Sequence, residues 1–274
     1  MQILPITDEE FARFQGLILS KAGISLSPQK KVMLSGRLQR RLMHFGLQTF
    51  GEYFDLLHSH DHPHEMQEMV DALTTNETYF FREPAHFDYF TNQVVPSLKS
   101  DIIRVWSAAC SSGEEAYTLA MLLSDKWQHK NWQVVGSDVS TKVLRMAQQG
   151  IYPFSRGEQI SPYYLSKYCL KGRGSYKGHF LIEKRIRQRV QFKQVNLLKP
   201  LPNMGQFDVI FLRNVLIYFN QETKKDVLQR LMGVLKKGGY LFVSHTESLH
   251  GIAPQLKLIK PSVFQKQPCE VNVA

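Results

Sequence analysis

From residue 102 onward, short apolar segments alternate with segments of helical periodicity. The apolar segments are rich in Val, Ile, Leu and Phe and lie at 102–106, 134–138, 190–197, 207–212 and 240–244. Helical patterns follow the turn at 108–115 and occupy 141–149 and 221–235, where Gly238 and Gly239 close the last helix. Strands that alternate with helices form a mostly parallel sheet covered on both faces. The pattern therefore predicts an α/β protein with a doubly wound, Rossmann-like sheet.

The first quarter of the chain has the features of a small helical domain. Thr7 and Glu10 form a capping box at the start of one helix. Ser27-Pro28 begins a second helix, which Gly46 ends, and a third short helix is predicted over 50–57. We therefore expect a helical N-terminal domain over 1–75 and an α/β domain over 76–274.

Basic residues are concentrated in two stretches. The chain has 34 Lys and Arg against 24 Asp and Glu, which gives a net charge of +10. Residues 21–51 contain no acid, and Arg37, Arg40 and Arg41 lie there beside the apolar stripe of the second helix. Such a basic face favours an acidic macromolecular partner, with a merely solvated face as the alternative.

The second basic stretch, residues 171–193, interrupts the alternation of strands and helices. Its first part is rich in glycine, and its second part alternates apolar with charged residues. A period of two is typical of a half-buried strand. We expect a hairpin or small sheet here, inserted into the larger domain as a β subdomain.

Small and acidic residues mark the ends of the first two predicted strands. A small-residue turn ends at Gly113, and Asp138 ends the next strand 25 residues later. An acid at that place binds a ribose diol in dinucleotide folds. The turn lacks a full GxGxxG, and Glu114 and Glu115 disfavour a phosphate at the following helix. A ligand with a ribose, a cationic amine and no phosphate fits better, and S-adenosylmethionine is such a ligand.

Several other classes of protein are disfavoured. Cys110, Cys169 and Cys269 form no CxxC pair, which argues against a disulfide framework or structural zinc and favours a reducing cytosol. No secretory signal is evident, and no apolar run approaches the ~18 residues of a membrane span, so we expect a cytoplasmic protein with no membrane insertion. Alternating histidines from His58 to His64 could ligate a metal, but we expect an exposed loop there and no metal site.

Four motifs together resemble the CheR family of bacterial chemotaxis receptor methyltransferases. In chain order they are LTTNETYFFRE at 73–83, WSAACSSGEE at 106–115, VNLL at 195–198 and FDVIFLRNVLIYF at 207–219. The resemblance extends over essentially the whole chain, including the basic second helix and the β insertion. Two departures are Ala116, where many members have proline, and Ser244-His245-Thr246-Glu247, which replaces a Gly-His-Ser-Glu pattern.

The resemblance implies an S-adenosylmethionine-dependent catalytic domain that esterifies glutamates and releases S-adenosylhomocysteine. It implies that Asn76, Thr78 and Arg82 line the cofactor and substrate mouth. It places Glu115 at the methionine amine, Asp138 at the ribose, and Asn196 with Leu197 at the adenine. Arg213, Asn214 and Tyr218 would close the site. Within the site we expect Arg82 to orient the substrate carboxylate and Tyr218 to donate a hydrogen bond to it. The alternatives are that Arg82 forms an ion pair with Glu83 or Asp88, and that Tyr218 only packs.

The implied partner is the cytoplasmic helical bundle of a chemoreceptor, bound through Arg37, Arg40 and Arg41. In some members the β subdomain also docks a receptor's C-terminal pentapeptide, and whether this one does is left open. Two other functions remain as alternatives, a nucleic-acid methyltransferase and a non-enzymatic module that binds the cofactor or its product. Against nucleic acid as a partner, no Asn/Asp-Pro-Pro-Tyr/Phe segment follows the strand at 207–212, where Arg213-Asn214-Val215-Leu216 stands.

Overall fold

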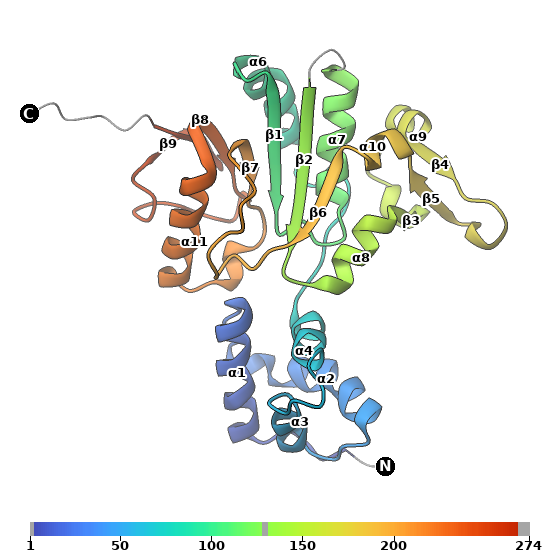
Figure 1. Ribbon diagram of the computed structural model, residues 1–274, viewed down its shortest axis with the longest axis vertical. Coiled ribbons are helices and arrows are strands. Elements are labelled where there is room, and N and C mark those ends of the chain that lie inside the picture. The colour runs from blue at the N-terminus through green and yellow to red at the C-terminus, as the bar shows by residue number, and fades with distance from the viewer. Residues whose placement is uncertain (1–2, 128–130, 268–274) are drawn as a thin grey trace, which may run out of the picture.

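A seven-stranded sheet forms the centre of the α/β part of the molecule (Figure 1). The computed structural model describes residues 3–127 and 131–267. The strand order is β6-β2-β1-β7-β8-β10-β9, in which β6 to β8 run parallel and β10 is antiparallel to both of its neighbours. The strands are β1 (Ile102–Ala108), β2 (Asn131–Asp138), β6 (Val190–Gln194), β7 (Phe207–Phe211), β8 (Leu235–Phe242), β9 (Leu256–Lys260) and β10 (Val263–Lys266). The predicted α/β class and Rossmann-like sheet are confirmed.

The sheet separates two hydrophobic cores, because successive side chains of a strand point to opposite faces. In β1, Val105 belongs to one core and Trp106 to the other. The first core is covered by α7 and by the segment from α5 to α6, and the second by α11. The bounds are α5 (Pro84–Tyr89), the π-helix η2 (Phe90–Val94), α6 (Val95–Ser97), α7 (Glu114–Lys126), α8 (Thr141–Gln149) and α11 (Gln221–Val234).

The N-terminal helices have a core of their own and lie against the carboxyl ends of the parallel strands (Figure 1). They are α1 (Asp8–Ala22), the 3-10 helix η1 (Pro28–Lys30), α2 (Lys31–Phe45), α3 (Phe50–Leu56) and α4 (Glu65–Leu73). The capping box of Thr7 and Glu10 begins α1, and Gly23 ends it at a φ of 73°. The sequence predicted the first three helices but not α4.

The Asp71 carboxylate of α4 joins the helical part to the sheet. It accepts hydrogen bonds from the backbone N–H groups of Thr141 and Lys142, at 3.1 and 3.0 Å, in the first turn of α8. The Thr141 hydroxyl adds a third, at 2.9 Å. Since these N–H groups have no partner within their own helix, Asp71 caps α8 from another element. The helical part is thereby fixed next to the strand end that carries Asp138.

The prediction of one β insertion over 171–193 is wrong in its bounds. The small sheet has the order β3-β5-β4, with β3 (Ile151–Pro153), β4 (Cys169–Lys171) and β5 (His179–Ile182). Between β3 and β4 lie η3 (Phe154–Gly157) and α9 (Pro162–Tyr168), and η4 (Gly174–Tyr176) precedes β5. Residues 184–187 form the short helix α10, and β6 belongs to the large sheet. Ile182, Ile186 and Val190 are buried at a spacing of four, which places side chains on one face of a helix and of a strand alike, so the pattern does not distinguish the two.

The end of α11 also differs from the prediction. The helix stops at Val234, and β8 starts at Leu235, so that Gly238 and Gly239 lie inside the strand. A Cβ on Gly239 would stand 2.9 Å from the Asp208 carbonyl oxygen. The glycine therefore permits a close approach of two strands at a point where their register shifts.

The basic face of α2, which the sequence predicted as a contact for an acidic partner, is largely bound within the protein. Arg37 donates to the carbonyl oxygens of Leu73 and Thr74, at 2.7 and 3.0 Å, and so binds the end of α4. The Arg41 guanidinium holds the buried Glu65 carboxylate with two hydrogen bonds. Arg40 is exposed, and it has no hydrogen bond or ion pair to any residue in the described ranges 3–127 and 131–267.

The remaining features noted in the sequence are the histidine-rich stretch, the cysteines and the apolar character of the helices. Residues 58–64 form an exposed loop between α3 and α4, as predicted. Cys110 and Cys169 are free thiols, and Cys269 lies outside the described residues. None of the helices within the described residues has the length and apolar character needed to cross a membrane.

We predict that Arg41→Gln lowers the free energy of unfolding by about 3 kcal/mol, because the buried Glu65 carboxylate loses its cation. Arg40→Gln is the matched control on the same helix, and it should stay within about 0.5 kcal/mol of the parent protein. Urea unfolding followed by circular dichroism measures both. Equal midpoints for the two variants would contradict the role given to Arg41.

Candidate active site

A cleft opens where the helical domain meets the carboxyl ends of β1, β2 and β7. The walls come from the end of α1, the segment 74–82, the turn after β1 and the loops after β2, β6 and β7. The sequence-predicted cofactor and catalytic residues all line this one cleft, namely Asn76, Thr78, Arg82, Glu115, Asp138, Asn196, Leu197, Arg213, Asn214 and Tyr218. Arg37, Arg40 and Arg41 lie outside it, in an adjoining groove.

The backbone after β1 adopts conformations that side chains ordinarily avoid. Ala109 and Ser111 have φ values of 65° and 50°, and Gly113 has 94°. Each such non-glycine residue costs on the order of 1–3 kcal/mol, and such residues concentrate at functional sites. A Cβ on Gly113 would stand 2.8 Å from that of Ala147, so the turn packs tightly on α8. The strained turn brings the Ser111 N–H to the end of β2.

Asp138 is the acid at the end of β2, and it is nearly buried. One carboxylate oxygen accepts the Ser111 N–H and the other the Ser140 N–H, both at 2.9 Å. Burial raises the pKa of this carboxyl group, and the two N–H donors act in the opposite direction. Two backbone bonds fix its plane, while its other lone pairs remain available to a diol in the cleft.

A buried guanidinium connects two acids beside the cleft. Arg213, whose side chain is 1% exposed, donates to Glu115 at 2.8 Å and lies 3.3 Å from Glu83. It also donates to the Arg82 carbonyl oxygen, at 2.5 Å. The Ser107 hydroxyl holds the other oxygen of Glu115, at 2.6 Å. Glu115 is thus held in a fixed orientation at the cleft wall, as a partner for a cationic amine.

The neighbouring Glu114 points away from the cleft. Its carboxylate is buried against Arg156 and the Ser112 hydroxyl. Burial raises the pKa of Glu114, although the bonds to Ser112 and Arg156 oppose that effect. Of the two glutamates at the start of α7, only Glu115 lines the cleft.

Arg82 and Tyr218 both line the cleft, and both side chains carry hydrogen-bond donors. Arg82 donates to the Glu77 carbonyl oxygen, at 3.0 Å, and lies over the Tyr79 ring. Among the residues that the structure describes, no carboxylate lies within ion-pair distance of Arg82, because Glu83 pairs with Arg213 instead. Tyr218 is half-buried in the 3-10 helix η5 (Leu216–Tyr218), and its carbonyl oxygen accepts the Ser25 N–H at 3.0 Å.

The asparagines predicted at the site are engaged mainly in holding the cleft's shape. Asn76 donates to the Thr74 hydroxyl, and its carbonyl oxygen accepts the Ser111 hydroxyl at 2.9 Å. Asn196 donates to the Lys21 carbonyl oxygen, at 2.7 Å, and so joins the loop after β6 to α1. Asn214 has a φ of 58° and donates to the Ser244 hydroxyl. An adenine ring would therefore meet the backbone and the Leu197 side chain more than the Asn196 amide.

Sequence reasoning missed Glu83, Ser107 and Glu247 as members of the site. Glu247 is buried and accepts the backbone N–H groups of Ser244, Asn214 and Ile217, which orders the loop after β7. Burial raises the pKa of Glu247, although these hydrogen bonds act to lower it. Each of the three lies within a quoted motif or departure, but only the folded chain shows what each one contacts.

Comparison with known families decides the relationship. Residues 76–264 match the model described as the CheR methyltransferase SAM binding domain, and residues 9–74 match its all-alpha domain. This chain belongs to the CheR methyltransferase family. The chemotaxis protein methyltransferase of Escherichia coli K12 is 39% identical over 95% of this chain and 92% of its own length. Those of Salmonella typhimurium and Borreliella burgdorferi are 38% and 36% identical, and cover 96% and 95% of this chain and 92% and 95% of their own lengths.

The residues of the cleft fit the family's cofactor, S-adenosylmethionine. Asp138 offers a fixed buried carboxylate for the ribose diol, and Glu115 offers an oriented acid for the amine. Gly136 lies under the turn, where a Cβ would stand 2.7 Å from the Phe192 ring. The glycine therefore permits the close packing of β2 against the Phe192 ring beside the turn.

Asp138→Asn should weaken the binding of S-adenosylmethionine and S-adenosylhomocysteine alike, by about 5- to 150-fold, since a buried hydrogen-bond pair contributes about 1–3 kcal/mol. Arg82→Ala, in the same cleft, is the matched control and should change cofactor affinity far less. Isothermal titration calorimetry measures both. Unchanged affinity in Asp138→Asn would remove Asp138 from the ribose site.

Proposed function

We propose that this CheR-family methyltransferase transfers a methyl group from S-adenosylmethionine to glutamate side chains on the cytoplasmic helices of chemoreceptors. The methyl esters formed would serve sensory adaptation. The observation that carries the proposal is the Arg82 guanidinium, which lines the cleft with no carboxylate partner among the described residues, whereas the other cleft arginine, Arg213, is paired with Glu83 and Glu115. We also propose a division of labour at residue 75, with a helical substrate-facing domain over 1–75 and a catalytic domain over 76–274.

The reaction requires a correctly oriented substrate carboxylate more than it requires proton transfer. When bound, S-adenosylmethionine supplies a methyl group on a cationic sulfur that leaves readily. A glutamate carboxylate is already ionised at neutral pH, so the chain needs no general base. Its residues must exclude water from the carboxylate and align it with the methyl group.

Arg82 and Tyr218 are the residues that we propose for this alignment. The Arg82 guanidinium keeps several N–H donors beyond its single bond to Glu77. It can therefore receive a carboxylate at the cleft mouth through charge-assisted hydrogen bonds. The Tyr218 hydroxyl can add one hydrogen bond and so fix the angle of approach. Tyr218 is half-buried and lines the cleft.

The substrate helix would lie along the groove that adjoins the cleft. This groove has a volume of about 580 Å³ and shares Thr74 and Asn76 with the cleft. Arg37, Arg40, Arg41, Lys142 and Arg156 contribute to its lining. Arg37 and Arg41 are bound internally, whereas Arg40 and Lys142 are exposed at its edge. These two cations are the proposed contacts for an acidic helix.

A receptor's C-terminal pentapeptide would dock, where a receptor has one, on the three-stranded sheet. β4 is an edge strand of that sheet, and Leu170 in it is exposed. An extended peptide can add itself to such an edge through backbone hydrogen bonds. This contact would tether the receptor without touching the cleft.

The decisive experiment incubates the protein with methyl-labelled S-adenosylmethionine and, in parallel, receptor cytoplasmic fragments and RNA. We expect label on the receptor fragment only, released as methanol by mild alkali, because carboxyl esters hydrolyse under conditions that leave N-methyl groups intact. Arg82→Ala should abolish most of the label. Alkali-stable label on RNA would support a nucleic-acid methyltransferase, and no transfer to either substrate would support a cofactor-binding module.

Arg40→Gln should raise the Michaelis constant for receptor fragments about two- to fivefold at low salt, in line with the ~1 kcal/mol of an exposed charge pair. The difference should shrink as salt screens the attraction. Lys237→Gln, an exposed lysine on β8, is the control and should behave as the parent protein. Steady-state rates at two salt concentrations test this. Identical constants for the two variants would contradict a substrate contact at Arg40.

A further inference from the structure

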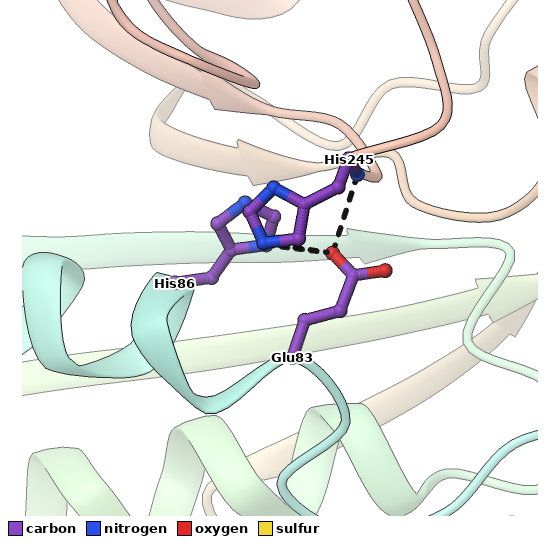
Figure 2. A group of neighbouring side chains, drawn as sticks. All are labelled: Glu83, His86 and His245. Atoms are coloured by element: carbon purple, nitrogen blue, oxygen red, sulfur yellow. Dashed lines mark hydrogen bonds and ion pairs between the residues drawn. The ribbon is translucent and has the colours of Figure 1, made fainter.

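Two histidines and a glutamate converge behind the active-site cleft. Glu83 and His86 come from the start of α5, and His245 comes from the loop after β8 (Figure 2). One donor atom from each lies within 4.8 Å of the other two. His86 is buried, whereas the side chain of His245 is 48% exposed. None of the three has a part in the methyl-transfer chemistry described above.

The spacing of the donor atoms matches a metal's coordination shell. Glu83 Oε2 lies 3.3 Å from His86 Nδ1 and 3.7 Å from His245 Nε2. In a tetrahedral zinc site the bonds to His N and carboxylate O are about 2.0–2.2 Å long, which separates neighbouring ligand atoms by about 3.3–3.6 Å. These two separations are close to the tetrahedral values, and all three donors lie within 4.8 Å of one another, so they converge on one region that an ion could occupy.

The outer nitrogens of both histidines meet at one hydroxyl group. Ser262 Oγ lies 2.6 Å from His86 Nε2 and 3.1 Å from His245 Nδ1. The hydroxyl donates its own proton to the Pro261 carbonyl oxygen, at 2.5 Å. Having one proton and two lone pairs, it can then only accept from the two rings. Both ring protons consequently lie on the outer nitrogens, as metal-binding histidines require.

This hydrogen-bond pattern leaves three lone pairs facing one another. His86 Nδ1 is buried, and it has no hydrogen-bond partner among the residues that the structure describes. With its proton on the opposite nitrogen, it presents a lone pair to the Glu83 carboxylate, and so does His245 Nε2. The Glu83 oxygen is already near the Arg213 guanidinium, at 3.3 Å, and accepts the His245 backbone N–H at 3.4 Å. A cation bound between the three atoms would relieve the remaining repulsion between their lone pairs.

We propose that Glu83, His86 and His245 bind one Zn²⁺ ion. Two imidazoles and a carboxylate are a familiar zinc ligand set, and water would take the fourth position on the exposed side of His245. Glu83 also lies 3.3 Å from Arg213, so its carboxylate would be shared between the ion and the guanidinium. Repulsion between these two cations limits the affinity. Arg213 in turn connects the ion with Glu115 in the cleft.

The test uses the full chain, stripped of metal by a chelator that is then removed. Zn²⁺ is titrated in competition with a chromophoric chelator, and Co²⁺ serves as a visible probe of tetrahedral geometry. We expect one ion per chain. His245→Ala, a change at an exposed side chain, should weaken binding more than the roughly 10- to 100-fold that outer-shell changes cost. Ser262→Ala should weaken it within that range.

The histidine-rich loop provides the matched control, since it is a second stretch with several possible metal ligands. Replacing His58, His60, His62 and His64 together by alanine should leave the affinity for Zn²⁺ unchanged. Absence of saturable one-to-one binding to the parent protein overturns the proposal. So does binding that survives His245→Ala, or binding that is lost with the loop histidines. The assay needs no methyl transfer, so its outcome is independent of the proposed function.

Discussion

The active-site cleft depends on one buried positive charge. Arg213 is enclosed by Glu115, Glu83 and the Arg82 carbonyl oxygen, with the Phe87 ring 5.4 Å from its guanidinium carbon. A guanidinium without such partners in this position would cost several kcal/mol. These partners come from α7, from α5 and from the segment before it, while Arg213 itself follows β7. The pairing therefore holds the backbone at Arg82 and the Glu115 carboxylate in a single arrangement.

The second constraint is the attachment of the helical domain over the strand ends. Asp71 caps α8 immediately after the loop that carries Asp138, and Asn76 binds Ser111, which itself binds Asp138. Asp138 is thus held through contacts that reach the helical part of the molecule. The walls of the cleft come from both parts, since Ala22 and Ile24 line it together with the residues that follow β1 and β2. The shape of the cleft consequently depends on the position of the helical part.

The sequence predicted those features that arise from local pattern or from a fixed place in a fold. The alternation of strands and helices predicted the sheet, and the place of Asp138 at a strand end predicted its position in the cleft. What it could not predict are partners chosen by tertiary proximity. Arg41 and Glu65 are 24 residues apart, and Arg213 and Glu83 are 130 apart, yet each pair forms an ion pair. The strand β3 was missed for a related reason, because three residues have too short a pattern to be recognised without β5 beside them.

The net charge shows the same limit of local reasoning. A helix face with Arg37, Arg40 and Arg41 reads from sequence as one continuous basic surface. In the folded chain Arg37 ends α4 and Arg41 neutralises a buried acid, so two of the three charges stabilise the domain. Arg156 at the other wall of the groove is similarly paired with Glu114. Fewer charges than the composition implies are therefore left to attract an acidic partner. Arg40 and Lys142 are among them, and they lie at the edge of the groove that adjoins the cleft.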